Sequence, residues 1–326
     1  MRIIVTMLLF GLLATFATGS ESASAEVTLT DVIKKVRENE KIYQNIELVM
    51  ETKYDIGDRP PWSDDLVFEQ ETRTRFISQG DWFRLERKGQ SLTLKRASPL
   101  DHTQSFDGKT TRVLYPNGVG TISPERVEDG NFIRPHSLIA RLELPFSVYL
   151  SGHKAVRAHA NVPWIKNRTM RVKYQGEEEQ SGLKCQKIVV EIVHQSGEAT
   201  SRSEYWLAEE RNYLAIKKLL YSNFSSKTLP VSESVVHDLQ EISPGVWFPF
   251  DVEAIRFNEF TIERDGLQVL QWRERHKVKT AKLDPKFDRK FFTNVDFPEG
   301  TEMHELVKGK IVRSWRQGSP KPPAEP

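Results

Sequence analysis

The strongest constraint on the fold is an alternation of apolar and charged residues with a period of two, which recurs along most of the chain. The first such segment covers residues 46–54, and the pattern returns at 66–76, at 82–87 and several times between 183 and 279. This alternation predicts half-buried strands, and the short turns between them exclude the long helical crossovers of a parallel sheet. We therefore expect a mainly β (α+β) protein with about ten strands in one large antiparallel sheet.

Two regions have helical spacing instead. In residues 30–43, Val32, Ile33, Val36, Ile42 and Tyr43 recur at helical spacing, with Thr30-Asp31 as the expected cap. A helical insertion at about residues 135–157 interrupts the strands, and its apolar spacing predicts two short helices, the second opening at Pro145. Because an apolar stripe is unstable in water, this insertion must pack against the sheet or cover something on its surface.

The N-terminus has the features of an export signal. Met1-Arg2 is followed by an apolar run at 3–16, and Ala23-Ser24-Ala25 offers a peptidase site before Glu26. The run is too short for a membrane-spanning helix, so we expect a cleaved signal peptide at 1–25 rather than an anchor. A single domain would follow at 26–307, and a basic, Pro-rich tail at 308–326 is expected to be disordered.

Composition supports an exported, soluble protein of a bacterial envelope, most simply the periplasm. The single cysteine, Cys185, excludes an intramolecular disulfide. The chain has 47 Lys+Arg against 45 Asp+Glu, a net charge of +2, which lacks the basic excess of a nucleic-acid binder. We expect no integral membrane segment after signal cleavage.

No motif in the chain makes a complete catalytic or metal site. Gly108-Lys109-Thr110 lacks the earlier glycine of a phosphate-binding loop, and Ser151-x-x-Lys154 lacks its partner motifs. His153 and His159 are six residues apart, which does not place two ligands on one helix face. Cys185 is expected to be a small buried hydrophobe. We therefore predict a non-enzyme with no cofactor and no metal.

Large apolar residues on the expected strand faces and in the helical insertion indicate more about the function than these incomplete motifs do. Either the curled sheet has a fully packed interior, or its curl leaves an apolar cavity under the helices. On the second interpretation the candidate cavity and lid residues are Phe68, Phe83, Leu85, Phe106, Tyr115, Leu142, Phe146, Phe248 and Phe250.

Three short motifs together resemble the LolA-like superfamily of outer-membrane lipoprotein carrier and sorting proteins. They are FDGKT at 106–110 followed by VLYP at 113–116, PGVWFP at 244–249, and FF at 291–292 followed by FPEG at 297–300. The resemblance implies an incomplete antiparallel β-barrel wrapped around helices that close an apolar cavity. Members of this family hold acyl chains of lipoproteins or lipids there and carry them without catalysis. The helical insertion and the extension beyond Val307 are not part of the shared motifs, and no cargo-contacting residue can be transferred.

Three hypotheses follow. The leading one is a carrier or sorting protein that binds lipid or lipoprotein acyl chains. The second is a sensor or adaptor that binds an envelope protein partner. The third is an enzyme acting on envelope polymers through carboxylates such as Asp101, Glu143 or Glu204.

Overall fold

The computed structural model describes residues 27–56, 68–93, 96–126, 133–142, 144–159 and 167–323. The predicted signal peptide and its cleavage site between Ala25 and Glu26 lie outside these residues, as does the candidate carboxylate Glu143.

Strands dominate the described chain. In chain order they are β1 (Ile46–Ile56), β2 (Phe68–Gln79), β3 (Trp82–Thr93), β4 (Arg96–Pro99), β5 (His102–Phe106), β6 (Thr111–Leu114), β7 (Val119–Ser123), β8 (Arg168–Gln180), β9 (Leu183–His194), β10 (Ala199–Ala208), β11 (Leu214–Ser222), β12 (Ser232–Ser243), β13 (Val246–Phe257), β14 (Leu270–Leu283), β15 (Glu302–Val307) and β16 (Lys310–Arg316). The helices are α1 (Leu29–Ile42), α2 (Pro135–Leu138), α3 (Phe146–Leu150), α4 (His153–His159), α5 (Glu259–Asp265) and α6 (Arg289–Thr293), with a 3-10 turn, η3 (Glu209–Arg211).

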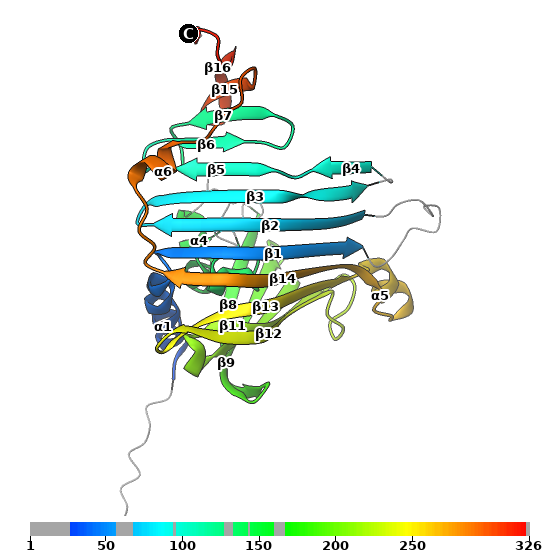
Figure 1. The fold of residues 1–326 in the computed structure, drawn as a ribbon. Coiled ribbons are helices and arrows are strands. Elements are labelled where there is room, and N and C mark those ends of the chain that lie inside the picture. Colours follow the sequence, from blue (N-terminus) through cyan, green and yellow to red (C-terminus); the bar gives the residue numbers. More distant parts are fainter. Residues whose placement is uncertain are drawn as a thin grey trace, which may run out of the picture.

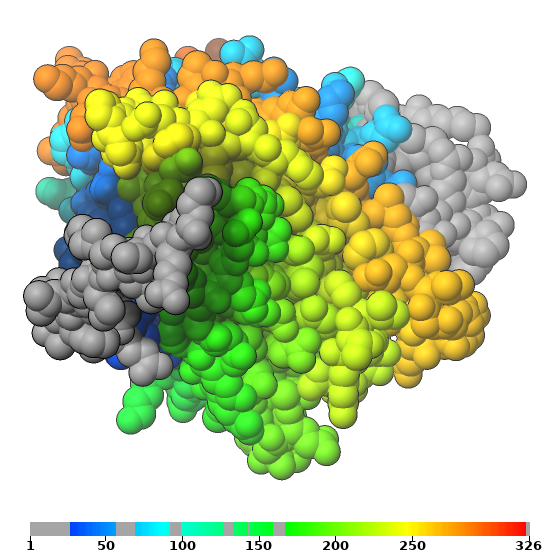
Figure 2. All heavy atoms as spheres, turned by 90° about the horizontal axis from the view of Figure 1, so that it is seen from below, coloured from blue at the N-terminus to red at the C-terminus, as the bar shows by residue number. Residues whose placement is uncertain are grey.

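All these strands belong to one open, curved sheet (Figure 1). The order is β16-β15-β7-β6-β5-β3-β2-β1-β14-β13-β12-β11-β10-β9-β8, and β4 pairs with β3 beside this path. In Figure 2, which shows the molecule from below, the residues of β8–β13 are coloured green to yellow and form much of the visible face. The predicted large antiparallel sheet, open rather than closed into a barrel, is confirmed. One pair departs from it, because β15 lies parallel to β7.

Helix α1 begins two to three residues earlier than the sequence pattern indicates. Thr28 is the N-cap: Asp31 N donates to the Thr28 hydroxyl, and the Asp31 carboxylate accepts from Thr28 N in return. This reciprocal capping box satisfies two N–H groups at the helix start, which is why it prevails over the predicted Thr30-Asp31 cap. Val32 and Val36 are fully buried, so the helix packs one apolar face onto the interior.

The helical insertion also packs inside the curve of the sheet. It forms three short helices instead of two, and Pro145 is the N-cap of α3 as predicted. A single hydrophobic core joins α1, α2 and α3 to the concave face, with Leu48, Phe76, Phe146 and Phe248 among its most buried members. Where α1, α2 and α3 pack against the concave face, side chains fill the interior.

The three short motifs that resemble the LolA-like superfamily lie at a hairpin turn, at the start of a strand and where a helix packs on the sheet. Asp107 turns the β5–β6 hairpin by accepting hydrogen bonds from Lys109 N (3.0 Å) and Thr110 N (2.9 Å). Trp247, at the start of β13, accepts at its carbonyl oxygen from the Tyr43 hydroxyl of the α1 C-cap. Phe292 of α6 packs on Trp82 at the convex face, with ring centroids 5.7 Å apart.

The C-terminal segment corrects one prediction. Residues 308–326 were expected to be disordered, but Lys310–Arg316 forms β16 and pairs with β15. Two basic side chains of this segment have a partner in β15, since the Glu305 carboxylate lies 2.6 Å from Arg313 Nη2 and 2.8 Å from Lys321 Nζ. Ion pairs and strand hydrogen bonds therefore order a segment whose composition alone predicts disorder.

Candidate functional site

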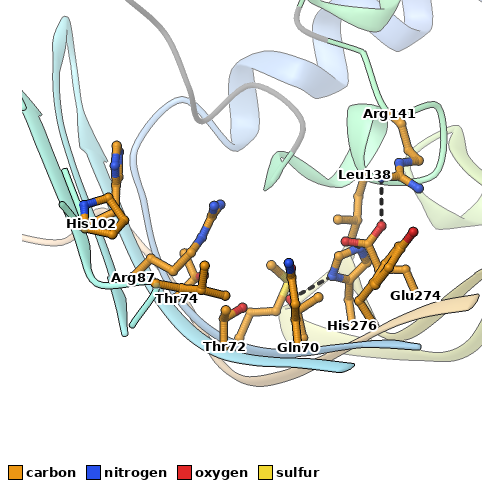
Figure 3. A pocket seen from close by; sticks show the side chains of 14 residues that line it. Gln70, Thr72, Thr74, Arg87, His102, Leu138, Arg141, Glu274 and His276 are labelled. Carbon is orange, nitrogen blue, oxygen red and sulfur yellow. Dashed lines mark hydrogen bonds and ion pairs between the residues drawn. The ribbon is translucent and has the colours of Figure 1, made fainter. Parts of the chain in front are cut away.

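A cavity of about 440 Å³ lies on the concave face, between β14, β1, β2 and β3 and the segment that follows α2 (Figure 3). This volume falls within the range of about 300–1,000 Å³ typical of small-molecule sites. Part of its wall is apolar and consists of Met50, Tyr54, Leu100, Pro116 and Leu138. The rest of the lining is polar, and the two kinds of residue are interspersed, since Thr52 lies between Met50 and Tyr54 on β1.

The polar part of the lining arises where polar residues replace large apolar ones on the inner faces of neighbouring strands. In β1 buried Met50 is followed by Thr52, and in β2 Thr72 precedes buried Phe76 on the same face. Thr52 lies opposite Thr72 on one side and His276 of β14 on the other. The polar stretches of three neighbouring strands therefore align, and the filled core gives way to a cavity at this point.

A network of polar groups forms the β14 wall of the cavity. Arg141, just after α2, places Nη2 2.8 Å from Glu274 Oε2 and its guanidinium 4.9 Å from the centroid of the Trp272 ring. His276 Nδ1 lies 2.9 Å from Thr52 Oγ1, and its Nε2 lies 3.7 Å from Glu274 Oε1. Burial lowers the pKa of His276, so the neutral imidazole predominates at neutral pH. This network attaches the segment after α2 to β14.

Lys218 adds a positive group next to this network. It lies in β11, in the same cross-strand row as Ser234, Ala254 and Glu274, and its Nζ donates to Ala140 O at 3.0 Å. Burial lowers the pKa of Lys218 to about 8, and the nearby guanidinium groups of Arg141 and Arg256 act in the same direction. At neutral pH Lys218 is therefore a buried cation beside Arg141, although it does not itself line the cavity.

The opposite wall comes from β2, β3 and β5. Arg87 of β3 lies between Thr74 of β2 and His102 of β5 in one cross-strand row. Figure 3 shows the Arg87 side chain rising from the strands into the cavity. The edge of the His102 ring faces Tyr115, with ring centroids 5.7 Å apart.

A second hollow, of about 450 Å³, lies between α1 and the α2–α3 segment. Its polar groups are largely paired with one another or with the backbone. Glu40 accepts from Ser147 N at 3.2 Å, and His136 Nε2 lies 2.9 Å from Asn212 O. Burial lowers the pKa of His136, which keeps this imidazole neutral as well. The concave cavity is the stronger candidate because it presents both apolar and polar residues to a ligand.

The residues predicted to form an apolar cavity or lid lie mainly in the filled part of the interior. Phe83, Leu85, Phe106, Phe146 and Phe248 are buried in the core, and Leu142 and Phe250 are half-buried against it. Neither of the two hollows is lined by any of the nine. Tyr115 is 39% exposed and reaches the cavity only through its contact with His102, and Phe68 begins β2 with a side chain outside the described part.

The carboxylates of the enzyme hypothesis are not brought together. Asp101 is exposed before β5 and accepts from Gly89 N, whereas Glu204 lies in β10, eight strands away along the sheet. Glu204 is occupied by ion pairs with Lys187 and Arg202. Cys185 is fully buried, and burial raises the pKa of its thiol to about 11, which disfavours the reactive thiolate.

Two further observations concern only the described residues. They contain no group of three or more metal-ligating side chains close enough to hold an ion. Their helices also include none with the length and apolar character needed to cross a bilayer.

No family model and no curated protein matches the sequence. Solved structures do match. One is a DUF1329 family protein from Desulfovibrio piger, with 13% identity and a TM-score of 0.39, over 81% of this chain and 96% of that chain. Another, from Vibrio parahaemolyticus, is described as an outer membrane lipoprotein-sorting protein domain, with 9% identity and a TM-score of 0.40, over 81% and 97%.

A third match is the lipoprotein LppX from Mycobacterium tuberculosis, with 9% identity and a TM-score of 0.24, over 79% and 99%. Because every TM-score is low, the neighbours determine neither cargo nor activity for this chain.

The sequence pattern did not single out the cavity residues, because large apolar side chains give the strongest signal of an inward-facing position. A usable signal was present. Thr52 interrupts the apolar residues of the inward face of β1, and the inward face of β2 carries Gln70, Thr72 and Thr74 in succession. Polar residues on an inward face mark a place where the core is not dry.

Proposed function

We propose that this chain binds the acyl chain of a lipid or lipoprotein in the concave cavity and carries or sorts that cargo in the cell envelope. The observation that supports this proposal is the cavity itself, whose lining contains both apolar and polar residues. Each CH₂ group transferred from water to apolar lining residues gains about 0.8 kcal/mol. An amphiphile satisfies both kinds of lining residue, whereas a purely polar solute would leave the apolar ones without a partner.

The segment after α2 holds one side of the cavity in place. The Arg141–Glu274 ion pair at 2.8 Å and the hydrogen bond from Lys218 Nζ to Ala140 O at 3.0 Å attach it to β14 and β11, and Ile139 and Ala140 are buried. The envelope location rests on the signal-peptide features of residues 1–25.

The test is native mass spectrometry, with lipid extraction, of protein purified without detergent. Thr72→Trp places a bulky ring on the cavity side of β2, and Arg73→Trp places the same ring on the opposite, exposed face one residue away. We expect an acyl species bound one-to-one to the wild type and to the Arg73→Trp variant, and strongly reduced occupancy in the Thr72→Trp variant.

Equal occupancy in all three proteins would mean that the cargo binds elsewhere. A ligand-free mass for the wild type, unchanged after incubation with lipid vesicles, would refute the carrier function. Unfolding curves of the two variants provide the control for correct folding.

A second candidate, the adaptor, is favoured by one specific observation. Phe224, Phe260 and Leu267 are 74%, 61% and 60% exposed around α5, where Ser225 Oγ lies 3.2 Å from Glu259 Oε2. Exposed apolar groups that gather at one end of a sheet are typical of a binding surface. A photo-crosslinking amino acid at position 260 should give one discrete protein adduct in living cells if the adaptor hypothesis is right, and none if it is wrong.

A further inference from the structure

Arg87 is unusual among the charged residues of the cavity. Within the part of the chain that the structure describes, its guanidinium makes no hydrogen bond and no ion pair. Its side chain is half-buried and points into the cavity (Figure 3). A guanidinium withdrawn from bulk water is normally paired with a carboxylate, a phosphate or a set of carbonyl groups.

The acidic group that lines the same cavity does not neutralise Arg87. Glu274 lies on β14, three strand positions from β3, which is about 14 Å at the usual strand spacing. Glu274 is also already paired with Arg141 at 2.8 Å. The positive charge on the β3 side therefore has no counter-charge among the described residues that line the cavity.

Neutral hydrogen-bonding groups surround Arg87 on the same face. Thr74 is its direct neighbour on β2 and is buried, and Thr72 and Gln70 follow on the same strand and also line the cavity. Hydroxyl and amide groups can donate to an anion without competing with it for the guanidinium. His102, the neighbour on β5, completes the row.

We propose that the cavity selects an amphiphile with an anionic group, a carboxylate or a phosphate, and that Arg87 binds this group while the apolar lining residues take the acyl chain. This inference rests on the proposed function and specifies its ligand class. Arg87 is suited to the role because a guanidinium binds either oxyanion through two parallel hydrogen bonds. The paired Arg141 then serves to hold the segment after α2, and the two arginines have different tasks.

The experiment measures the affinity of the full chain for matched ligands. Oleate and 1-oleoyl-lysophosphatidate carry the two anionic groups, oleyl alcohol is the neutral counterpart with the same chain, and acetate and inorganic phosphate are the free anions. The variants are Arg87→Gln and, as a matched control, Arg73→Gln, which removes one positive charge from the exposed opposite face of the neighbouring strand.

We expect the wild type and the Arg73→Gln variant to bind at least one anionic amphiphile about ten-fold or more tightly than oleyl alcohol, the scale of a charge-assisted hydrogen bond. The preferred anionic amphiphile identifies the head group. In the Arg87→Gln variant this preference should disappear while the affinity for oleyl alcohol stays the same.

Equal affinity of the wild type for oleyl alcohol and both anionic amphiphiles would overturn the role of Arg87 and leave the carrier function standing. An unchanged preference of the Arg87→Gln variant for the anionic amphiphile would likewise overturn the role of Arg87 and leave the carrier function standing. Tight binding of acetate or inorganic phosphate alone would show that the cavity binds free anions, and it would refute the proposal that the ligand is an amphiphile. If none of the three oleyl compounds binds, the proposed function itself is wrong.

Discussion

Replacing Phe146 by alanine tests whether the interior near α3 is filled. Phe146 is 0% exposed, and its ring centroid lies 5.2 Å from that of Tyr205 and 6.5 Å from that of Tyr149. Removing a fully buried phenyl ring from such a place costs about 3–5 kcal/mol, because the loss of burial is added to the cost of the cavity left behind. This is a large part of the roughly 5–15 kcal/mol that holds a typical domain together.

The assay is urea unfolding followed by tryptophan fluorescence, with the free energy of unfolding extrapolated to water. Phe224→Ala is the matched control, since the same ring is removed from a position 74% exposed, where we expect a change within about 0.5 kcal/mol. Oleate affinity of the folded Phe146→Ala variant should be unchanged, because Phe146 does not line the concave cavity. A cost below about 1 kcal/mol, or a loss of oleate affinity, would refute the packed interior and favour an apolar ligand cavity at α3.

Two further predictions concern pH. Hydrogen bonds from Arg313 and then Lys321 lower the pKa of Glu305 from 4.5 to about 2, so its ion pairs stabilise the fold fully above about pH 4.5 and are lost as the pH falls towards 2. The stability advantage of the wild type over Glu305→Gln, measured by urea unfolding, should therefore shrink between pH 5 and pH 2, and a constant difference would contradict the β15–β16 pairing. The pKa of Lys218 is lowered from 10.5 to about 8, so the unfolded chain binds more protons between these values. The wild type should then gain stability relative to Lys218→Met as the pH rises from 8 to 10.5, and a difference that does not change with pH would place the Lys218 amine in water.

The sequence pattern predicts the sheet well because the period of two is a local property of each strand. The alternation at residues 46–54 becomes β1, and the Asp107-Gly108 turn becomes the β5–β6 hairpin. The antiparallel course follows from the short connections. The parallel pairing of β15 with β7 could not be predicted in this way, because it joins segments separated by most of the chain.

The candidate site was harder to predict than the fold. The alternation identifies which side of a strand faces inward, but it does not say what an inward side chain meets there. Phe83 and Phe106 meet each other, with ring centroids 6.1 Å apart, and so fill space that a ligand would need. Thr72 and His276 are smaller or polar, and the cavity forms beside them.

The charge pairing of the site was also not predictable from the sequence, because its contacts join residues that are far apart in the chain. Arg141 follows α2 and Glu274 lies in β14, so their ion pair depends on how the helical insertion folds back over the sheet. Likewise, Arg87 is unpaired only because the acidic residues near it in sequence, such as Glu86, point to the other face of β3, where Glu86 pairs with Arg84. Neither relation is visible in a linear pattern.

The most direct test of the central claim is photo-labelling with a fatty acid that carries a diazirine near the end of its chain, followed by peptide mapping. The account predicts saturable labelling of the peptides that contain residues 50–54 and 70–74, displaced by excess oleate and lost in the Thr72→Trp variant. Labelling confined to residues 134–148 at the second hollow, or labelling that oleate does not displace, would contradict the placement of the ligand on the concave face.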